Sequence, residues 1–435
     1  MTNKITINVK QVFNLALQYQ NQKNYNEAKK LYKKLIKTEP NLIEAQYNLG
    51  VIYEETKDYD EAIKYYKKTI YLNPLFIYSY NNLGLIYNKL GKYKVSIEYL
   101  IKLKKINPKY VNAYNNLGIA YISLGQYEEA IENFISALNI DKNNSNSLYN
   151  LIQALRFCIP KIKSPIIEIS KELKNLNKNI DFEELLISNN NLSNFLNSAY
   201  FHKNKIKNLN FSHLIETQVY RQNTTDLNCR RHHDIFNKRK IIPKFCFGCF
   251  KVQIEPINVL NLIKLYLIFD NFKFPQNNLR KCLIELRSNI KGLYKGIIYC
   301  SSIDEAEKVL KDISPMLNKY LKYKSTIRRG CSEFYSVFPE FKTAKNEGNL
   351  MKYDDKWKKI EFDEDKNKHQ KKTVLLNSLQ GLSISDLMII DKWIYYASLI
   401  GDKSFEDLKL QITKSKYIDY EMTNQKEFRI KQLQN

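Results

Sequence analysis

Residues 47–53 read YNLGVIY, and closely similar stretches follow at residues 81–87 (NNLGLIY) and 115–121 (NNLGIAY). The interval is 34 residues both times. Prolines keep the same interval, at Pro40, Pro74 and Pro108. A period of this length is typical of an architecture in which short structural repeats stack on one another.

Each repeat has the pattern of two short amphipathic helices. Small residues recur where helices must approach closely: Gly50, Gly84 and Gly118 in the first helix, and Ala28, Ala62 and Ala130 in the second. The prolines end the second helix and begin the turn to the next repeat. One helix pair cannot bury its apolar face alone, so we expect the repeats to stack into a continuous solenoid.

The repeat resembles the tetratricopeptide-repeat (TPR) family. The resemblance covers Val9 to Asp141 as four full repeats, followed by a capping helix from Ser145 to Phe157. It implies an N-terminal TPR α-solenoid over residues 9–157. TPR proteins typically hold peptides or protein segments on their concave face, so the resemblance also implies a protein or peptide partner.

An asparagine precedes the leucine of successive repeats, at Asn48, Asn82, Asn116 and Asn150. A row of carboxamides offers paired donors and acceptors, which suits an extended peptide backbone. Such a ladder is similar to that of TPR domains attached to O-linked N-acetylglucosamine transferases. The alternative is that these asparagines only cap or solvate the helices. The helix period adds further predicted groove residues, which include Tyr47, Tyr78, Asn81, Asn112 and Asn115. We expect these groove carboxamides to contribute little to the stacking of the repeats.

The composition sets limits on the function. The chain has 435 residues and a formal net charge of +24, but its lysines are scattered, so the charge alone does not favour a nucleic-acid partner. No apolar run reaches the roughly 18 residues of a membrane helix, and residues 1–11 lack the apolar core of a signal peptide. We therefore expect a cytoplasmic protein with no membrane partner, whose cysteines are reduced thiols or metal ligands.

Arginines and cysteines are concentrated in one part of the chain. Eight of the ten arginines fall between Arg221 and Arg329, and six of the seven cysteines fall between Cys229 and Cys331. The planar guanidinium binds anions in a bidentate manner that lysine cannot reproduce. We therefore predict an anionic ligand or an acidic partner surface here, bound by Arg328, Arg329, Arg230 and Arg231.

The same part of the chain, residues 228–342, has the pattern of an α+β domain. Three strands are expected before its second helix, at 245–255, 281–287 and 293–300, and a fourth at 325–334. Helices are expected at 257–270 and 303–321. This order, β-α-β-β-α-β, is the ferredoxin-like arrangement. A helical linker, residues 158–227, precedes the domain, and a C-terminal helical segment and tail, residues 343–435, follow it, with a helix from Ser383 to Leu399 that stops at Gly401.

The ferredoxin-like strand order predicts that distant cysteines meet at one sheet edge. Cys246, Cys249, Cys282, Cys300 and Cys331 would lie there, with Cys282 and Cys300 nearly opposite across a hairpin and Cys229 as a substitute ligand. Four soft thiolate ligands suit zinc or an iron–sulfur cluster. Two alternatives stay open: buried free cysteines acting as small hydrophobes, and a nucleophilic cysteine, for which Cys331 is the best candidate because flanking arginines would lower its pKa.

Two functions follow from these patterns. The first is an interaction protein whose TPR groove docks a protein or peptide and whose second domain is cysteine-rich and binds a metal. The second is a thiol- or metal-dependent enzyme that uses the TPR array to recruit a protein substrate. The sequence holds no phosphate loop, dinucleotide fingerprint, serine nucleophile elbow or paired-histidine metal motif. Nucleic-acid binding by a ferredoxin-like sheet would require paired aromatics on central strands, and only Phe250 and Tyr299 are available.

Overall fold

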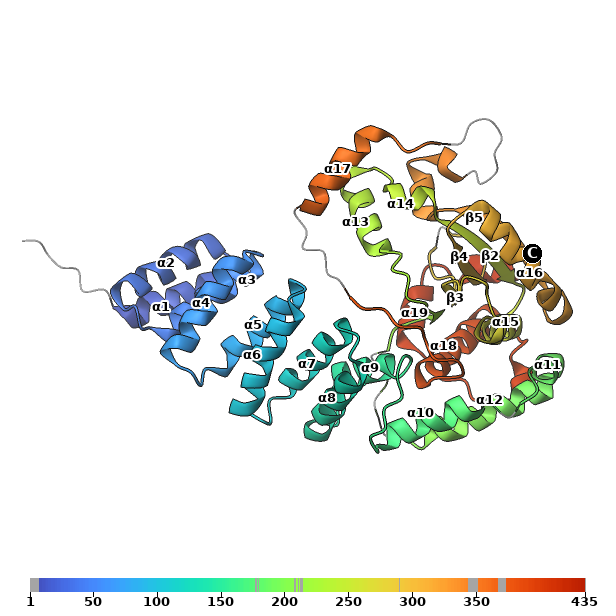
Figure 1. Cartoon of the computed structure of the whole chain (residues 1–435), viewed down its shortest axis with the longest axis horizontal. Coiled ribbons are helices and arrows are strands. Elements are labelled where there is room, and N and C mark those ends of the chain that lie inside the picture. Colours follow the sequence, from blue (N-terminus) through green and yellow to red (C-terminus); the bar gives the residue numbers. More distant parts are fainter. Residues whose placement is uncertain are drawn as a thin grey trace, which may run out of the picture. The chain divides into compact units, whose positions relative to one another are not determined.

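The computed structural model describes residues 8–176, 178, 180–206, 209, 211, 214–288, 290–342, 351–366 and 373–434 (Figure 1). The chain divides into two compact units within one helix: the first unit ends at Asn150 and the second begins at Leu151. No helix of the described residues combines the length and the apolar character needed to cross a lipid bilayer.

The first unit is a stack of paired antiparallel helices. In chain order they are α1 Val9–Asn21, α2 Tyr25–Thr38, α3 Ile43–Glu55, α4 Tyr59–Leu72, α5 Ile77–Lys89, α6 Tyr93–Ile106, α7 Val111–Ser123, α8 Tyr127–Ile140 and α9 Ser145–Ala154. Each helix from α1 to α7 contacts the helix that follows it in the chain, as stacking of the repeats requires.

Close packing explains the repeated glycines. A Cβ atom on Gly50 would lie 2.8 Å from the Tyr66 ring, and one on Gly84 would lie 2.6 Å from Leu100. Only a residue without a side chain lets the first helix of a repeat approach the second so closely. The core between the helices is made of fully buried alanines, leucines and tyrosines, Tyr32 and Tyr66 among them.

The second unit combines an antiparallel sheet with helices. Its strands are β1 Gln218–Arg221, β2 Phe250–Pro256, β3 Arg280–Ile284, β4 Tyr294–Cys300 and β5 Tyr323–Arg329. Its helices are α10 Pro165–Leu176, α11 Phe182–Ile187, α12 Asn189–Asn204, α13 Cys229–Arg239, α14 Lys244–Phe247, α15 Val259–Asn271, α16 Ile303–Tyr320, α17 Asp355–Lys366, α18 Ile384–Ile400, α19 Lys416–Met422 and α20 Lys426–Gln434. Short 3-10 helices are η2 Ser332–Ser336, η3 Pro339–Lys342 and η4 Glu406–Leu408.

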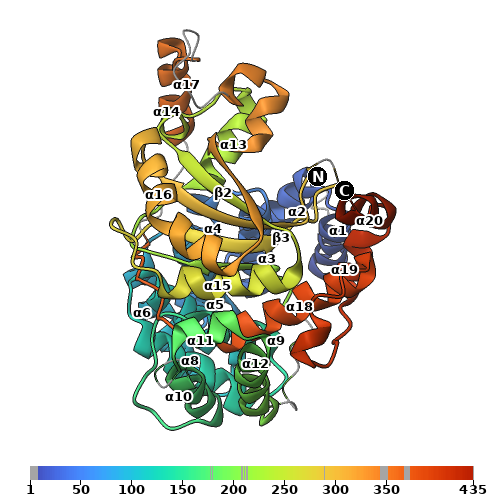
Figure 2. The same cartoon turned by 90° about the vertical axis from the view of Figure 1, so that its right-hand side faces the viewer.

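The five strands lie in the order β1-β3-β4-β2-β5, and all neighbours are antiparallel. Helices α15 and α16 pack against the sheet (Figure 2). Gly296 in β4 lies under α15, because a Cβ there would meet Leu265 and Phe269. Side chains alternate between the two faces of a strand, so Lys295, Ile297 and Tyr299 of β4 face away from α15.

A buried ion-pair network fixes helix α18 against the sheet. Arg221 at the end of β1 pairs with Asp270 of α15 and with Asp386 of α18, and Tyr266 donates a hydrogen bond to Asp386. Helix α18 begins with a capping box in which Ser383 and Asp386 bond each other's backbone N–H groups, and it ends at Gly401, whose φ is +84°. The predicted helix from Ser383 to Leu399 is therefore present.

The boundaries of three strands differ from the sequence-based expectation. The strand predicted at 281–287 runs from Arg280 to Ile284. The predicted strand at 245–255 begins instead with a helical turn, Lys244–Phe247, and β2 starts at Phe250. The predicted strand at 325–334 stops at Arg329, because Gly330 has a φ of +57° and turns the chain into η2. Cys331 thus follows a turn instead of lying within a strand.

Candidate functional site

The sheet face opposite α15 lines a cavity of about 850 Å³, here called the sheet-face cavity. Arg328, Lys251 and Tyr299 are register partners across β5, β2 and β4, and all three line it. Lys281 and Ile297, partners across β3 and β4, line it further along the sheet. A volume of this size is within the range of small-molecule sites.

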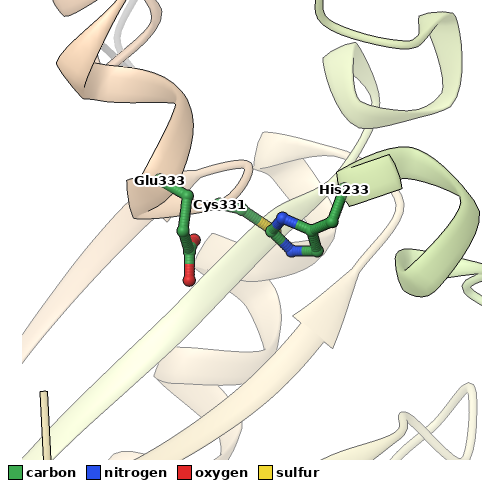
Figure 3. A group of neighbouring side chains, drawn as sticks. All are labelled: His233, Cys331 and Glu333. Atoms are coloured by element: carbon green, nitrogen blue, oxygen red, sulfur yellow. The ribbon is translucent and has the colours of Figure 1, made fainter. Parts of the chain in front are cut away.

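Cys331 and His233 meet at one end of the sheet-face cavity. Cys331 comes directly after the Gly330 turn, and His233 lies on α13. Figure 3 shows the two side chains reaching toward each other, with Glu333 of η2 beside them. One ligand atom from each of these three residues lies within 4.8 Å of the other two, and no other group of three or more such side chains is found in the described part of the chain.

The surroundings of Cys331 favour the thiolate. Burial alone would raise the pKa of the Cys331 thiol, but a hydrogen bond from His233 and the charge of Lys251 outweigh burial and lower the pKa. The Lys251 ammonium donates to the sulfur over 3.5 Å. A cysteine with a lowered pKa next to histidine and lysine is the arrangement that produces a reactive thiolate.

The partner groups shift in the complementary direction. The hydrogen bond to Cys331 raises the pKa of His233, against the opposing effect of burial. Burial would lower the pKa of Lys251, but the charges of Cys331 and Glu333 and the hydrogen bond to Cys331 raise it. Both pKa shifts favour a thiolate on Cys331 and an imidazolium on His233, with the ammonium of Lys251 as a second positive charge beside the sulfur.

The Glu333 carboxylate is engaged by an arginine. Arg287 donates to Glu333 over 2.7 Å and to Glu285 over 2.8 Å. Burial would raise the pKa of Glu333, but a hydrogen bond from its own backbone and the charge of Arg287 lower it. Glu333 is therefore a carboxylate, and it helps to hold the positive charges of His233 and Lys251 at this end of the sheet-face cavity.

The five predicted metal-binding cysteines are not brought together as one group in the described residues. Cys282 pairs with Gly296 across the hairpin, not with Cys300, so it lies on the face that α15 covers. Cys331 lies on the opposite side, in the sheet-face cavity. The expectation that Cys282 and Cys300 are opposite is therefore wrong. The first residue of β3, Arg280, pairs with Ile298, so Cys300 lies on β4 two residues beyond the end of β3.

The other predicted cysteines lie outside the His233–Cys331–Glu333 group. Cys246 belongs to the same apolar cluster as Cys331, together with Phe334 and Phe341. Cys249 and Cys300 line a second cavity of about 560 Å³. Burial raises the pKa of Cys249 and of Cys300 to about 12, and it raises those of Cys246 and Cys282 as well. These four cysteines are therefore neutral thiols, and Cys331 is distinguished from them by charge.

The four predicted anion-binding arginines also separate. Arg329 lies between the rings of Phe247 and Phe341 and is 8% exposed, and Arg231 pairs with Asp365 and Glu361. Arg230 is exposed on α13 and does not line the sheet-face cavity. Arg328 does line it, 3.7 Å from Glu255. The pKa of Cys331 is thus lowered by His233 and Lys251, not by the flanking arginines that the sequence indicated.

In the first unit, the asparagine ladder connects neighbouring repeats. Asn116 donates to the Oδ1 of Asn81 over 3.1 Å, and Asn150 donates to that of Asn115 over 2.9 Å. Asn82 donates to the hydroxyl of Tyr47 over 3.3 Å and to that of Tyr66 over 3.0 Å. Asn48 similarly donates to Tyr32 of the preceding repeat. The expectation that these carboxamides contribute little to stacking is therefore wrong, because their N–H groups bond to side chains of the preceding repeat.

The predicted aromatic groove residues form a cluster with one further residue. Tyr47 and Tyr78 pack against Phe76, with ring centroids 5.1 Å and 5.8 Å away. Tyr78 is 51% exposed, and Asn112 is exposed as well. Phe76 was missed because it precedes α5, whereas the helix period covers only helical residues.

The sequence did not identify His233, Lys251 or Glu333 as partners of Cys331. His233 stands in the run Arg230-Arg231-His232-His233, which marked the region but not the residue. Lys251 is one of many lysines, and only its place on β2 distinguishes it. A strand pattern that puts Lys251 on the polar face was the signal available.

Comparisons with known proteins concern the first unit. Models of the tetratricopeptide repeat match residues 12–41, 43–76 and 76–143, and no other family is found. No curated protein matches the chain.

Solved structures also resemble the chain. MamA from residue 41 to its end, from Desulfovibrio magneticus RS-1, is 24% identical, with a TM-score of 0.32, over 34% of this chain and 82% of that one. YrrB, described as a TPR protein with an unusual peptide-binding site, is 21% identical, with a TM-score of 0.30, over 33% of this chain and 74% of that one.

Proposed function

We propose that this chain, a tetratricopeptide-repeat protein, binds an extended segment of a partner protein in the groove of its array. The observation that carries the proposal is the aromatic cluster beside the asparagine ladder, in which Tyr78 is exposed and Tyr47 and Phe76 are half-buried. An exposed aromatic ring offers a large contact area at a low entropic cost. The N–H groups of the ladder amides are used within the array, and the Oδ1 of Asn82 accepts from Asn81. The half-buried Asn48 and Asn150 would present their carbonyl oxygens to backbone N–H groups of the segment.

A peptide library selected against the intact protein tests this proposal. Tyr78→Ala and Asn112→Ala change exposed groove positions, so they should weaken the selected peptides by about tenfold without lowering the melting temperature. Tyr71→Ala is the matched control, because Tyr71 is 78% exposed but lies on α4, the second helix of its repeat. Equal affinity in the groove variants and the control would contradict the proposal.

A second function, thiol-dependent catalysis in the second unit, is favoured by the Cys331 site. We propose that the Cys331 thiolate is the nucleophile, with His233 as its proton partner and Lys251 as the group that stabilises the negative sulfur. The TPR array would then recruit a protein substrate. Such a site requires a reducing compartment, which agrees with a cytoplasmic location.

Rates of alkylation by iodoacetamide test the nucleophile. At pH 7, Cys331 should react faster than the other six cysteines, since burial raises the pKa of Cys246, Cys249, Cys282 and Cys300. His233→Asn should slow the alkylation of Cys331 and leave the alkylation rates of the less reactive cysteines unchanged. A Cys331 that reacts no faster than these buried thiols would exclude the proposal.

A metal centre is the competing chemistry for the same cysteine. His233, Cys331 and Glu333 offer nitrogen, sulfur and oxygen ligands that suit zinc. A metal ion would have to bind beside the Lys251 ammonium and compete with Arg287 for Glu333, which disfavours a cation there. We therefore propose zinc or an iron–sulfur cluster only as the alternative. Stoichiometric zinc or iron in the purified protein, released together with an increase in Cys331 alkylation, would favour it.

We also propose that residues 250–329 are a ferredoxin-like domain to which β1 is added. The element order β2-α15-β3-β4-α16-β5 and the strand order β3-β4-β2-β5 support this assignment. The helices of such a domain cover one face of the sheet, which leaves the other face for a ligand. The sheet-face cavity is at that position.

A further inference from the structure

We propose that the sheet-face cavity binds a small ligand that carries a dianionic group such as a phosphate, held by Lys251 and Lys281 next to Cys331. This inference rests on the proposed thiol site for the role of the ligand as substrate, but not for its binding. It follows from the charges in the sheet-face cavity, from the position of two lysines, and from the size of the space.

Seven lysine and arginine side chains line the sheet-face cavity, against three carboxylates. Several of these cations are already neutralised: Lys295 pairs with Glu285, Arg287 with Glu285 and Glu333, and Arg328 with Glu255. The other four cations, Lys251, Lys281, Lys291 and Lys342, have no carboxylate within 4.0 Å in the part of the chain that the structure describes. Lys291 and Lys342 are exposed to solvent, whereas Lys251 and Lys281 are half-buried on the sheet.

The contacts of the two lysines leave their charges available. Lys281 donates to the Oε1 of Gln218 over 2.9 Å and to the hydroxyl of Tyr220 over 3.4 Å, both neutral groups. Lys251 donates to the sulfur of Cys331. Neither lysine pairs with a carboxylate, so the two ammonium groups on this face of the sheet lack a carboxylate counterion among the described residues. A dianion is the ligand that would neutralise them.

The two ammonium groups face the same part of the sheet-face cavity. Lys251 pairs with Tyr299 and Lys281 pairs with Ile297, two residues apart on β4, so both lysines lie on the same face of the sheet. Both lysines lie close to tyrosine rings, Lys251 at 5.5 Å from Tyr299 and Lys281 at 5.3 Å from Tyr220. A phosphate between the lysines would therefore lie beside Cys331 and over an aromatic surface that can pack against the rest of the ligand.

Protection of Cys331 from alkylation tests the inference. The intact protein is treated with iodoacetamide at pH 7 with inorganic phosphate or pyrophosphate, and sodium chloride holds the ionic strength constant. A saturable slowing of Cys331 alkylation is expected, about tenfold when the anion is at ten times its Kd. Lys281→Gln should abolish the protection, whereas Lys281→Arg, which keeps the charge, should retain it.

The control and the opposing outcomes separate the two proposals. Lys308→Gln removes an exposed lysine of α16 and should keep full protection. Fast alkylation of Cys331 that neither anion slows, or full protection in Lys281→Gln, would overturn the anion site and leave the thiolate proposal intact. If Cys331 itself reacts slowly, the thiolate proposal fails instead, and the anion site is decided by thermal unfolding of Cys331→Ala. Phosphate should then raise the melting temperature of Cys331→Ala more than that of the double variant with Lys281→Gln, and equal shifts would reject the site.

Discussion

Replacing Lys251 by glutamine should raise the pKa of Cys331. The ammonium of Lys251 lies 3.5 Å from the sulfur, and its charge favours the thiolate. Coulomb's law gives about 5 kcal/mol for two unit charges at this separation with an effective dielectric constant of about 20, and about 2 kcal/mol if screening is twice as strong. An interaction of this size is large enough for the pKa of Cys331 to rise measurably when the ammonium is removed.

The pKa can be read from alkylation rates between pH 5 and pH 10. The rate follows the thiolate fraction, so the pH of half-maximal rate is the apparent pKa of the Cys331–His233 pair. Because the wild-type pKa is lowered, the plateau should begin at a lower pH in the wild type than in Lys251→Gln. His233→Asn should shift the profile in the same direction, since His233 donates the hydrogen bond that lowers the pKa.

Two results would refute this reasoning. The first is an unchanged profile in Lys251→Gln, which would mean that the ammonium does not act on the sulfur. The second is an equal shift in Lys308→Gln, an exposed lysine on α16, which would mean that overall charge and not the 3.5 Å contact controls the pKa. Circular dichroism of each variant checks that the fold is retained.

Three further changes test the stability of the fold. Gly84→Ala should lower the free energy of unfolding by about 1–3 kcal/mol in a urea titration, because its Cβ would lie 2.6 Å from the leucine that it faces. Asn116→Ala should lower the free energy of unfolding by about 1–2 kcal/mol in the same assay, since it leaves the Oδ1 of Asn81 without its donor. The control Asn112→Ala, at an exposed position, should leave the free energy of unfolding almost unchanged. Equal losses in the two variants would contradict a structural role for the ladder. Burial lowers the pKa of His232 to about 4, so the unfolded chain binds a proton that the native state does not, and stability should fall by about 3 kcal/mol as the pH drops from about 6.5 to 4. His232→Phe should remove that part of the pH dependence, and an unaltered pH profile would contradict it.

The repeat array was predictable because its sequence signal is local and repeated. A 34-residue period fixes which residues face the core in every helix pair, so one repeat identifies the others. The hydrogen bonds that connect repeats were harder to predict from the sequence. Asn82 was predicted as a groove residue, but its bonds to Tyr47 and Tyr66 depend on side-chain positions that the period does not specify.

The order of strands and helices in the second unit could also be predicted from the alternation of apolar residues. The ends of the strands could not be predicted in this way. Strand register depends on the loop that joins two strands, and the loop between β3 and β4 determines that Cys282 lies opposite Gly296. An error in the predicted register moves a side chain along the strand or to the other face of the sheet. Such an error is sufficient to separate cysteines that the predicted strand order brings to one edge.

The Cys331 site illustrates a limit that has a physical cause. His232 and His233 are adjacent on α13, yet consecutive helix residues point about 100° apart. His232 therefore stacks on Phe245 and stays neutral, whereas His233 reaches Cys331 and gains charge. Lys251 reaches the same sulfur from a strand 80 residues earlier in the chain. No spacing in the sequence encodes this meeting, because it is produced by the turn at Gly330, the rotation of α13 and the alternation of β2 acting together. The chemistry of Cys331 is thus a property of the tertiary structure, and a change that rotates α13 without altering any of the three residues should abolish it.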